Sequence, residues 1–407
     1  MLEPASIGMI SGAALMGFAG VRAFGEVRGL VRRRVREIDV TEQRRAAFAN
    51  QLEAALDWAL ASQPALKAWT GTRPFRVTAV VDEAPRMRSF YLAPEDGRPL
   101  PRFEPGQYLT FHLPSADPMR PLVRCYSLSE RPREDYYRVT VKLNGRGSGL
   151  LHREVHPGAV LHAEAPQGTF FLDPTDSTPL VLVGAGIGVT PLVSMASALV
   201  HRGDLRPIFA FTGFRSSREH PFRSRLSELA SAAANLRLDV SYSQPLATDF
   251  AGRDFDHHGH ADAARLRQVL PSSNFRYYIC GPARMMESLV PALLRWGVPA
   301  SHILYEAFGP ASVKGLAAAS ATTPCEVQFS RSGRSLRWTG GEASLLELAE
   351  QGGVALESGC RAGSCGQCRV MLAAGRVTHA KPPGVQLVGG ECLACIARPD
   401  GDVVVEA

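Results

Sequence analysis

Three cysteines lie within nine positions of this chain, and their spacing restricts the C-terminal part more than any other feature of the sequence. The stretch ESGCRAGSCGQCRV reads Cys360-x4-Cys365-x2-Cys368, and Cys395 follows in CLACIARP. Four thiolates can bind either zinc or an iron–sulfur cluster. Structural zinc sites usually pair their cysteines as two C-x2–4-C knuckles, whereas three candidate ligands here come from one loop and the fourth from far away. The spacing therefore favours a [2Fe–2S] cluster, with zinc as the alternative.

Glycines separate these cysteines, at Gly359, Gly363 and Gly366. Because glycine has no Cβ, the backbone can wrap closely and turn its N–H groups toward sulfur atoms. Such hydrogen bonds are one of the main controls over the potential of a cluster. A disulfide or a pair of reactive thiols does not explain this placement. The fourth ligand stays open at this point, because Cys392 lies only three residues before Cys395.

The composition limits the class of protein. At 407 residues the chain is long enough for about two or three domains. The other four cysteines, Cys125, Cys280, Cys325 and Cys392, are scattered and do not form the framework of a secreted disulfide-rich protein, so we expect a reducing, cytoplasmic compartment. The net charge is +6, but six arginines crowd into residues 22–36, and no basic face interleaved with aromatic residues is found elsewhere. Nucleic-acid binding is therefore not expected.

The N-terminal region, residues 1–71, is expected to be helical. Residues 4–21 carry no charge and are just long enough to span a bilayer, and the arginines that follow would lie on the cytoplasmic side. From Asp39 a capping box and an apolar stripe predict a helix. Residues 4–36 therefore predict membrane association, by spanning or by lying at the interface. The alternative is an amphipathic or buried helix, because the run is only modestly hydrophobic.

Two further domains and a linker are predicted between this region and the cysteine motif. In residues 72–176, short alternating runs broken by Pro and Gly predict an antiparallel six-stranded β-barrel: FRVTAVV, SFYLAP, QYLTFHL, RCYSLSE, YYRVTVKL and AVLHAEA. Residues 177–310 alternate buried strands with helical stretches, which predicts an α/β domain with a parallel sheet. Residues 311–323 are small and nearly uncharged, as expected of a linker. Residues 324–407 form the last domain.

A Gly-rich turn in the α/β domain is typical of nucleotide binding. VGAGIGVTP places Gly184, Gly186 and Gly188 between a strand and a helix, where helix N-terminal N–H groups can bind a pyrophosphate. The spacing is G-x-G-x-G rather than the Rossmann G-x-G-x-x-G, and many Gly-rich turns are only turns. The motif therefore indicates nucleotide binding only together with the other motifs of the chain.

A second motif, RCYS, lies at a strand end of the predicted barrel. A flavin needs a cation for its phosphates, an apolar or aromatic surface for its ring and a hydrogen-bonding group near the reacting edge, and Arg124, Tyr126 and Ser127 supply these. Gly147 and Ser148 in NGRGSGLLH offer a turn and a helix start for the pyrophosphate. From the residues alone, RCYS could equally be an edge strand.

Several motifs in the right order resemble a known family. PGQYLTFHLP, RCYSLSE, GAGIGVTP, YICGP and YEAFGP resemble the ferredoxin–NADP reductase superfamily over about residues 72–310, most closely the flavin-reductase half of flavohaemoglobins. The stretch from CEVQFSRSGRSLRW to GCRAGSCGQCRVMLAAGRV resembles a plant-type ferredoxin domain over about residues 324–407. The resemblance implies an FAD-binding barrel, an NAD(P)-binding domain and an α+β ferredoxin domain of the β-grasp type. It also favours Cys395 as the fourth ligand, because this cysteine precedes the apolar IA and Pro399 as in that family.

The resemblance also implies cofactor contacts, residue by residue. FAD is expected to meet Tyr108, Arg124, Cys125, Tyr126 and Ser127, with Gly147 and Ser148 at its pyrophosphate. NAD(P)H is expected to meet Gly184, Gly186, Gly188, Thr190, Pro191, Gly281 and Pro282. The candidates nearest to the reacting atoms are Ser127, Thr190 near the nicotinamide, Cys280 and Phe308. Cys280 could equally be a buried thiol packed at the cofactor cleft.

The three sites predict one path for electrons. A nicotinamide delivers two electrons as a hydride and a [2Fe–2S] cluster carries one, so FAD is the expected converter between them. The predicted function is an NAD(P)H-dependent reductase that serves a separate oxygenase, hydroxylase or desaturase, as implied by the appended ferredoxin domain. The alternative is a non-catalytic redox sensor or an electron-relay subunit of a membrane complex. NADH and NADPH both remain candidates for the electron donor, because Arg215, Ser216 and Arg218 in GFRSSREHPF could bind the 2′-phosphate of NADPH. In DHHGH, His257, His258 and His260 could bind a metal, although a solvated loop is favoured.

Overall fold

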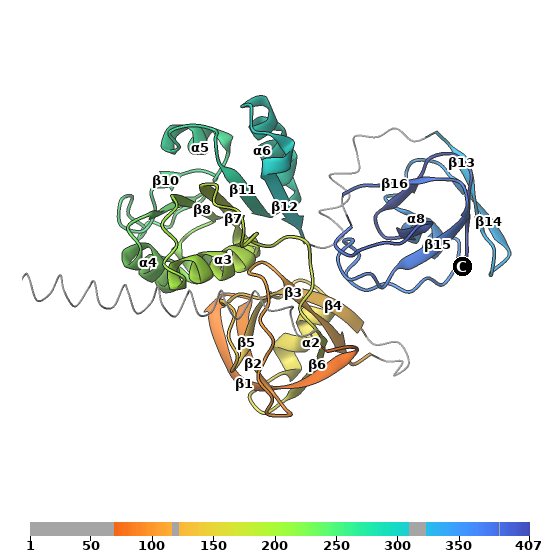
Figure 1. The fold of residues 1–407 in the computed structure, drawn as a ribbon, viewed down its shortest axis with the longest axis horizontal. Helices are drawn as coiled ribbons and strands as arrows, with labels where there is room; N and C mark the ends of the chain where they lie inside the picture. Colours follow the sequence, from red (N-terminus) through yellow and green to blue (C-terminus); the bar gives the residue numbers. More distant parts are fainter. Residues whose placement is uncertain (1–68, 116–121, 309–322, 382) are drawn as a thin grey trace, which may run out of the picture. The chain divides into compact units, whose positions relative to one another are not determined.

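A computed structural model describes residues 69–115, 122–308, 323–381 and 383–407 (Figure 1). Three folded domains follow one another in this part of the chain, and each has its own hydrophobic core. Within the described ranges, no helix is both long and apolar enough to cross a membrane. The predicted N-terminal helices and membrane segment lie outside the described residues, as does most of the predicted linker.

The first domain is an antiparallel six-stranded sheet that curves around its core (Figure 1). Its strands are β1 (Thr72–Ala84), β2 (Met87–Pro94), β3 (Tyr108–Leu113), β4 (Leu122–Ser127), β5 (Tyr137–Lys142) and β6 (Val160–Glu164), in the order β4-β3-β6-β1-β2-β5. The alternation in β1 explains the fold, because Phe75 and Val77 are fully buried while their neighbours face outward. A single helix, α2 (Arg146–Glu154), follows β5. The predicted six-stranded domain is confirmed.

The second domain is a parallel six-stranded sheet with helices. Its strands are β7 (Leu180–Ala185), β8 (Ile208–Phe214), β9 (Leu236–Tyr242), β10 (His257–His258), β11 (Arg276–Gly281) and β12 (Ile303–Ala307), in the order β10-β9-β8-β7-β11-β12. The helices are α3 (Val189–His201), α4 (Arg223–Ala232), α5 (Ala263–Val269) and α6 (Ala283–Arg295), with short 3-10 turns η1 (Gly186–Gly188), η2 (Ser217–Glu219) and η3 (Ala300–His302). After β7, strands β8, β9 and β10 are added on one side of it, and β11 and β12 are then added on its other side. Ligands of such sheets bind where the strand order reverses, which here is the carboxyl end of β7.

The third domain is a small mixed sheet with one helix in the described residues. Its strands are β13 (Cys325–Phe329), β14 (Arg334–Trp338), β15 (Arg369–Ala374), β17 (Glu391–Leu393) and β19 (Val403–Val405), in the order β14-β13-β19-β15-β17, with a separate pair of β16 (Val377–His379) and β18 (Ala397–Pro399). Helix α8 (Leu345–Gln351) begins at Ser344, whose side chain accepts a hydrogen bond from the N–H of Glu347. Its residues Leu345 and Leu348 pack in one core with Trp338. The predicted α+β domain is confirmed.

Candidate functional site

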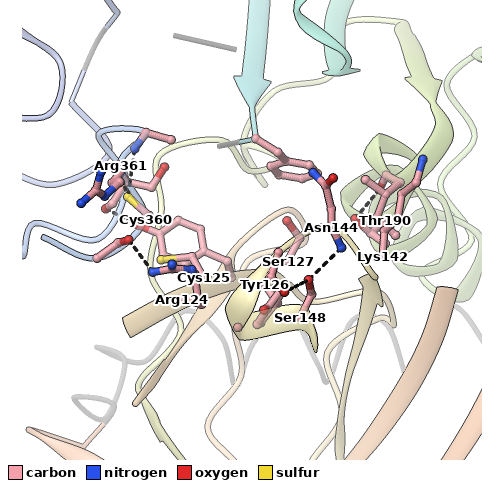
Figure 2. A pocket seen from close by; sticks show the side chains of 18 of the residues that line it. Arg124, Cys125, Tyr126, Ser127, Lys142, Asn144, Ser148, Thr190, Cys360 and Arg361 are labelled. Carbon is pink, nitrogen blue, oxygen red and sulfur yellow. Dashed lines mark hydrogen bonds between the residues drawn. The ribbon is translucent and has the colours of Figure 1, made fainter. Parts of the chain in front are cut away.

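A cavity of about 330 Å³ gathers most of the predicted cofactor residues (Figure 2). Its walls come from strands β3 and β4, the start of α2, the turn before α3, the end of β12 and the cysteine loop. Among the side chains that line it are Arg124, Tyr126, Ser127, Ser148, Thr190 and Glu306. Segments that are far apart in the sequence therefore line one cavity.

The RCYS strand β4 forms one wall of the cavity. Arg124 donates from Nη1 to the carbonyl oxygen of Gly359 at 3.0 Å, and burial lowers the pKa of its guanidinium. Tyr126 is half-buried beside Phe111, with ring centroids 5.8 Å apart, and burial raises the pKa of its hydroxyl. The hydroxyl oxygen of Ser127 is buried and has no hydrogen-bond partner among the described residues. An orphaned buried hydroxyl beside a cavity is a fit for a cofactor that supplies the missing partner.

The turn into α2 offers a phosphate site next to Arg124. Gly145, at φ 157°, precedes the helix, and no side chain caps the first N–H groups. A Cβ at Gly147 would lie 2.7 Å from Cγ of Arg124, so only glycine allows this close approach. Ser148 accepts from the N–H of Asn144 at 2.8 Å and donates to the carbonyl of Gly145 at 3.1 Å, which holds the turn in shape. Free helix N-terminal N–H groups beside an arginine fit the pyrophosphate of FAD.

The Gly-rich turn lies at the carboxyl end of β7, where the strand order reverses. A Cβ at Gly188 would lie 2.3 Å from the carbonyl oxygen of Cys280, and one at Gly184 would lie 2.6 Å from Leu192. Gly186 is in the left-handed region, at φ +55°. Thr190 donates from its hydroxyl to the carbonyl of Ile187 at 2.9 Å and is 2% exposed. The turn therefore packs directly on β11 and leaves its N-terminal face for a dinucleotide.

The residues of the YICGP stretch are placed differently from one another. Cys280 is fully buried in the core and does not line the cavity, and burial raises the pKa of its thiol well above the usual value. A Cβ at Gly281 would lie 2.5 Å from Cε of Met285 and 3.3 Å from Cβ of Ala185, and Pro282 precedes α6. Pro191 is buried within α3. The geometry supports the reading of Cys280 as a packed thiol whose backbone, rather than its sulfur, shapes the site.

The cysteine loop wraps its sulfur atoms in backbone donors. Sγ of Cys360 accepts from the N–H groups of Ala362 at 3.4 Å, Ser364 at 3.2 Å and Cys365 at 3.3 Å. Sγ of Cys365 accepts from the N–H of Cys360 at 3.3 Å. Contacts with the thiols of Cys125 and Cys365 hold the pKa of Cys360 well below its usual value. Gly363 and Gly366 take left-handed conformations, at φ +73° and +74°. This donor set fits an iron–sulfur cluster.

The structure separates the two candidates for the fourth ligand. Sγ of Cys395 accepts from the N–H of Gly363, inside the cysteine loop, at 3.2 Å. Contact with the Cys395 thiol also lowers the pKa of Cys368. Cys392 lies on β17 opposite Val370 and is completely buried. The geometry therefore favours Cys395 over Cys392 as a ligand.

Two known domain families match this chain. The oxidoreductase NAD-binding domain matches residues 182–290, and the 2Fe-2S iron-sulfur cluster binding domain matches residues 327–400. The chain therefore contains an NAD-binding domain of the oxidoreductase type and a [2Fe–2S] cluster binding domain. Its cofactors are FAD, NAD(P)H and a [2Fe–2S] cluster.

Two solved structures and one curated relative are similar to parts of this chain. One solved structure is phthalate dioxygenase reductase, described as a modular structure for electron transfer from pyridine nucleotides to [2Fe–2S]. It is 25% identical to this chain, with a TM-score of 0.53, and the match covers 83% of this chain and 98% of that chain. The flavohem-like FAD/NAD-binding domain of nitric oxide dioxygenase from Vibrio cholerae is 29% identical, with a TM-score of 0.53, over 58% of this chain and 99% of that domain. A flavohemoprotein of Rhizobium meliloti is 36% identical over 249 residues, which are 60% of this chain and 62% of the relative. This chain thus spans less than two thirds of that relative.

Glu306 in YEAFGP lines the cavity although it is not among the site residues predicted from the sequence. It is 7% exposed, and its Oε2 atom has no hydrogen-bond partner among the described residues. Burial raises the pKa of this carboxyl to about 7, an effect that Lys381 partly opposes. The sequence contained one indication of this residue: a single acidic residue stands among apolar residues at the end of a predicted parallel strand. The ends of such strands form binding sites.

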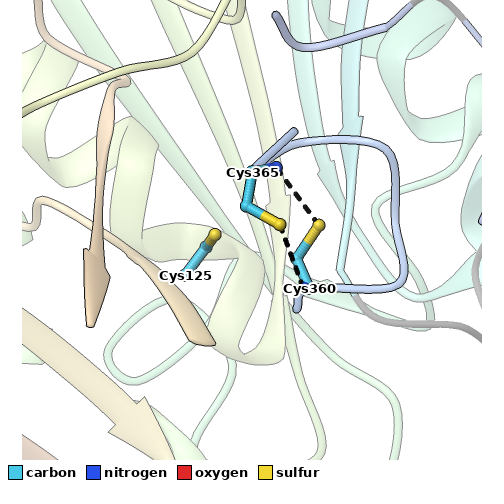
Figure 3. A group of neighbouring side chains, drawn as sticks. All are labelled: Cys125, Cys360 and Cys365. Atoms are coloured by element: carbon cyan, nitrogen blue, oxygen red, sulfur yellow. Dashed lines mark hydrogen bonds between the residues drawn. The ribbon is translucent and has the colours of Figure 1, made fainter. Parts of the chain in front are cut away.

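Two residues predicted to contact FAD, Tyr108 and Cys125, also lie close to the cysteine loop. Tyr108, expected at FAD, lines the cavity but its hydroxyl donates to the carbonyl of Ser364 in the cysteine loop. The sulfurs of Cys125, Cys360 and Cys365 lie within 4.8 Å of one another (Figure 3). In the described part of the chain, no histidine joins such a group of three. Phe308 lines the cavity as expected.

Proposed function

We propose that this chain is a reductase that passes electrons from NAD(P)H through FAD and a [2Fe–2S] cluster to a separate acceptor protein, such as an oxygenase, hydroxylase or desaturase. One observation carries the proposal: a single cavity is lined by the flavin strand, the Gly-rich nucleotide turn and the cysteine loop. The likeness to phthalate dioxygenase reductase over 98% of that chain supports the same order of carriers. An oxygenase is the favoured class of acceptor because that reductase is named for one.

The proposed work of the side chains is placement. When bound, FAD accepts an electron pair as hydride and releases the electrons singly, which connects the nicotinamide to the cluster. Arg124 and the N–H groups at Gly147 and Ser148 hold the FAD phosphates. The orphaned hydroxyl of Ser127 would donate to the flavin ring, and Thr190 would lie near the nicotinamide. The ligands proposed for the cluster are Cys360, Cys365, Cys368 and Cys395.

The purified protein is expected to contain FAD and about two irons per chain, as a [2Fe–2S] cluster requires. It should reduce cytochrome c with NADH or NADPH under anaerobic conditions, because the acceptor takes single electrons. Visible absorption spectroscopy, iron analysis and a steady-state assay check these three points on one preparation.

Two outcomes would contradict this assignment. One zinc per chain without visible cluster absorption would remove the cluster from the scheme. A fully loaded protein with negligible turnover would favour the sensor or relay, in which the carriers report a redox state without passing electrons to a soluble acceptor.

The raised pKa of Glu306 predicts a pH dependence of flavin reduction. Below pH 7 the carboxyl is neutral, and above it the group carries a negative charge that opposes the negative charge delivered by a hydride. We therefore expect the rate of flavin reduction by NAD(P)H to fall several-fold as the pH rises through about 7. Glu306→Gln should keep the low-pH rate throughout, as measured by stopped-flow absorbance between pH 6 and 8. Identical pH profiles for both proteins would exclude this role.

We further propose that the reductase works in the cytoplasm, where NAD(P)H and reduced thiols are found. Attachment to the membrane through residues 4–36 stays a prediction from the sequence. Cell fractionation of the full-length protein against a version that starts at residue 38 tests it. Equal recovery of both versions in the soluble fraction at low salt would exclude the anchor.

A further inference from the structure

The sulfur of Cys125 lies against the cysteine loop although its strand belongs to the flavin site. Cys125 stands between Arg124 and Tyr126 on β4. Its Sγ atom lies within 4.8 Å of the Sγ atoms of both Cys360 and Cys365 (Figure 3). The cluster already has four proposed ligands without Cys125. The thiol therefore needs another explanation than iron ligation.

The barrel, and not the loop, fixes the position of this sulfur. Thr110 on β3 is directly opposite Cys125 in the antiparallel register, and its hydroxyl lies 3.5 Å from Sγ of Cys125. Thr110 is completely buried, so its side chain has little freedom to move. Directly opposed residues of antiparallel strands are close neighbours, which explains the contact. The thiol is thus presented to the loop from a rigid sheet.

Other contacts bring the same loop to the same sheet. Arg124 donates to the carbonyl of Gly359 at 3.0 Å, and a Cβ at Gly359 would lie 3.0 Å from Cγ1 of Val123. Tyr108 on β3 donates to the carbonyl of Ser364. The approach of Cys125 to the cluster ligands is therefore one part of an extended contact between β3, β4 and the loop.

Among the described residues, the donors to Sγ of Cys360, Cys365 and Cys395 are backbone N–H groups of the loop itself. A cysteine thiol is a weak hydrogen-bond donor, and thiolate sulfur is an acceptor. We propose that Cys125 donates an S–H···S hydrogen bond to the ligand pair Cys360 and Cys365 and so raises the reduction potential of the cluster. The reason is that a donor stabilises the more negative, reduced form more than the oxidised form. The inference rests on the proposed cluster and adds a side chain from the flavin domain to its surroundings.

The test uses the full-length, cofactor-loaded protein and two substitutions at one position. Cys125→Ala removes the donor, whereas Cys125→Ser keeps one. Cys325→Ala is the matched control, because Cys325 is a buried thiol of the same domain as the cluster and lies outside this group of three. The readout is the potential of the cluster, from a redox titration followed by its EPR signal, together with FAD and iron contents.

We expect a downward shift of the cluster potential in Cys125→Ala and values close to the native one in Cys125→Ser and Cys325→Ala. After exchange into D2O, pulsed EPR of the native protein should also detect a deuteron coupling that Cys125→Ala loses. A native potential and an unchanged deuteron signal in Cys125→Ala, with FAD and iron retained, would overturn this inference alone. Equal shifts in the alanine and serine variants would also overturn it, since packing would then be the cause. A native protein without a cluster would overturn the proposed function as well.

Discussion

Replacing Cys365 by serine is expected to abolish electron delivery to one-electron acceptors while NAD(P)H still reduces FAD. Cys365 is 6% exposed, and its sulfur accepts from the N–H of Cys360 at 3.3 Å, which places it at the centre of the cysteine loop. Loss of an outer partner of a metal ligand typically costs about 10–100-fold in metal affinity, so loss of a ligand itself should exceed this. Hydride transfer precedes the cluster in the proposed path, so it should survive.

The measurement separates the two steps. Stopped-flow absorbance follows flavin reduction after mixing with NAD(P)H, and an anaerobic cytochrome c assay follows delivery. Cys325→Ser is the matched control, because it removes a buried thiol of the same domain without touching the loop. Loss of flavin reduction in a folded, FAD-loaded Cys365→Ser protein would contradict the linear path.

The same assay distinguishes the two candidates for the fourth ligand. Cys395 approaches the loop through the N–H of Gly363, whereas Cys392 is paired on β17. Cys395→Ser should therefore lose iron and delivery, and Cys392→Ser should retain both. The reverse result would move the fourth ligand to Cys392.

Replacing Gly188 by alanine is expected to lower the rate of flavin reduction by NAD(P)H about a hundredfold. The added Cβ would lie 2.3 Å from the carbonyl oxygen of Cys280 and 2.6 Å from the N atom of Gly281, both of them backbone atoms of β11 that cannot turn aside. The Gly-rich turn must then move away from the strand. A misplacement of about 1 Å at a substrate-positioning element costs on the order of a hundredfold in rate.

The control for this substitution is Gly213→Ala on the neighbouring strand β8. A Cβ at Gly213 would meet Ala261 at 3.6 Å and Ala185 at 3.7 Å, which are ordinary contact distances. Both variants should keep FAD and the cluster, and dithionite should reduce both fully. A Gly188→Ala protein that NAD(P)H reduces at the native rate would show that the turn does not position the nucleotide.

Much of the fold follows from local patterns in the sequence. Alternation over residues 72–176 reflects strands with one buried face, and the change of pattern at residue 177 reflects buried parallel strands separated by helices. The motif Cys360-x4-Cys365-x2-Cys368 with its glycines determines a loop of sulfur ligands, because left-handed glycines at 363 and 366 turn backbone N–H groups toward them. These features depend on residues close together in the chain, so the sequence alone contains them.

The tertiary structure decided which distant segments meet. Arg124 and Gly359 are 235 positions apart and share a hydrogen bond, and no local pattern links them. The pKa of Glu306 depends on how completely the surrounding elements bury it, which the sequence around it does not state. The sequence by itself predicted the cofactors and the order of their domains along the chain. Only the tertiary structure placed Glu306 at the cavity and the thiol of Cys125 beside two proposed cluster ligands, because burial and contact at such separations arise from the whole fold.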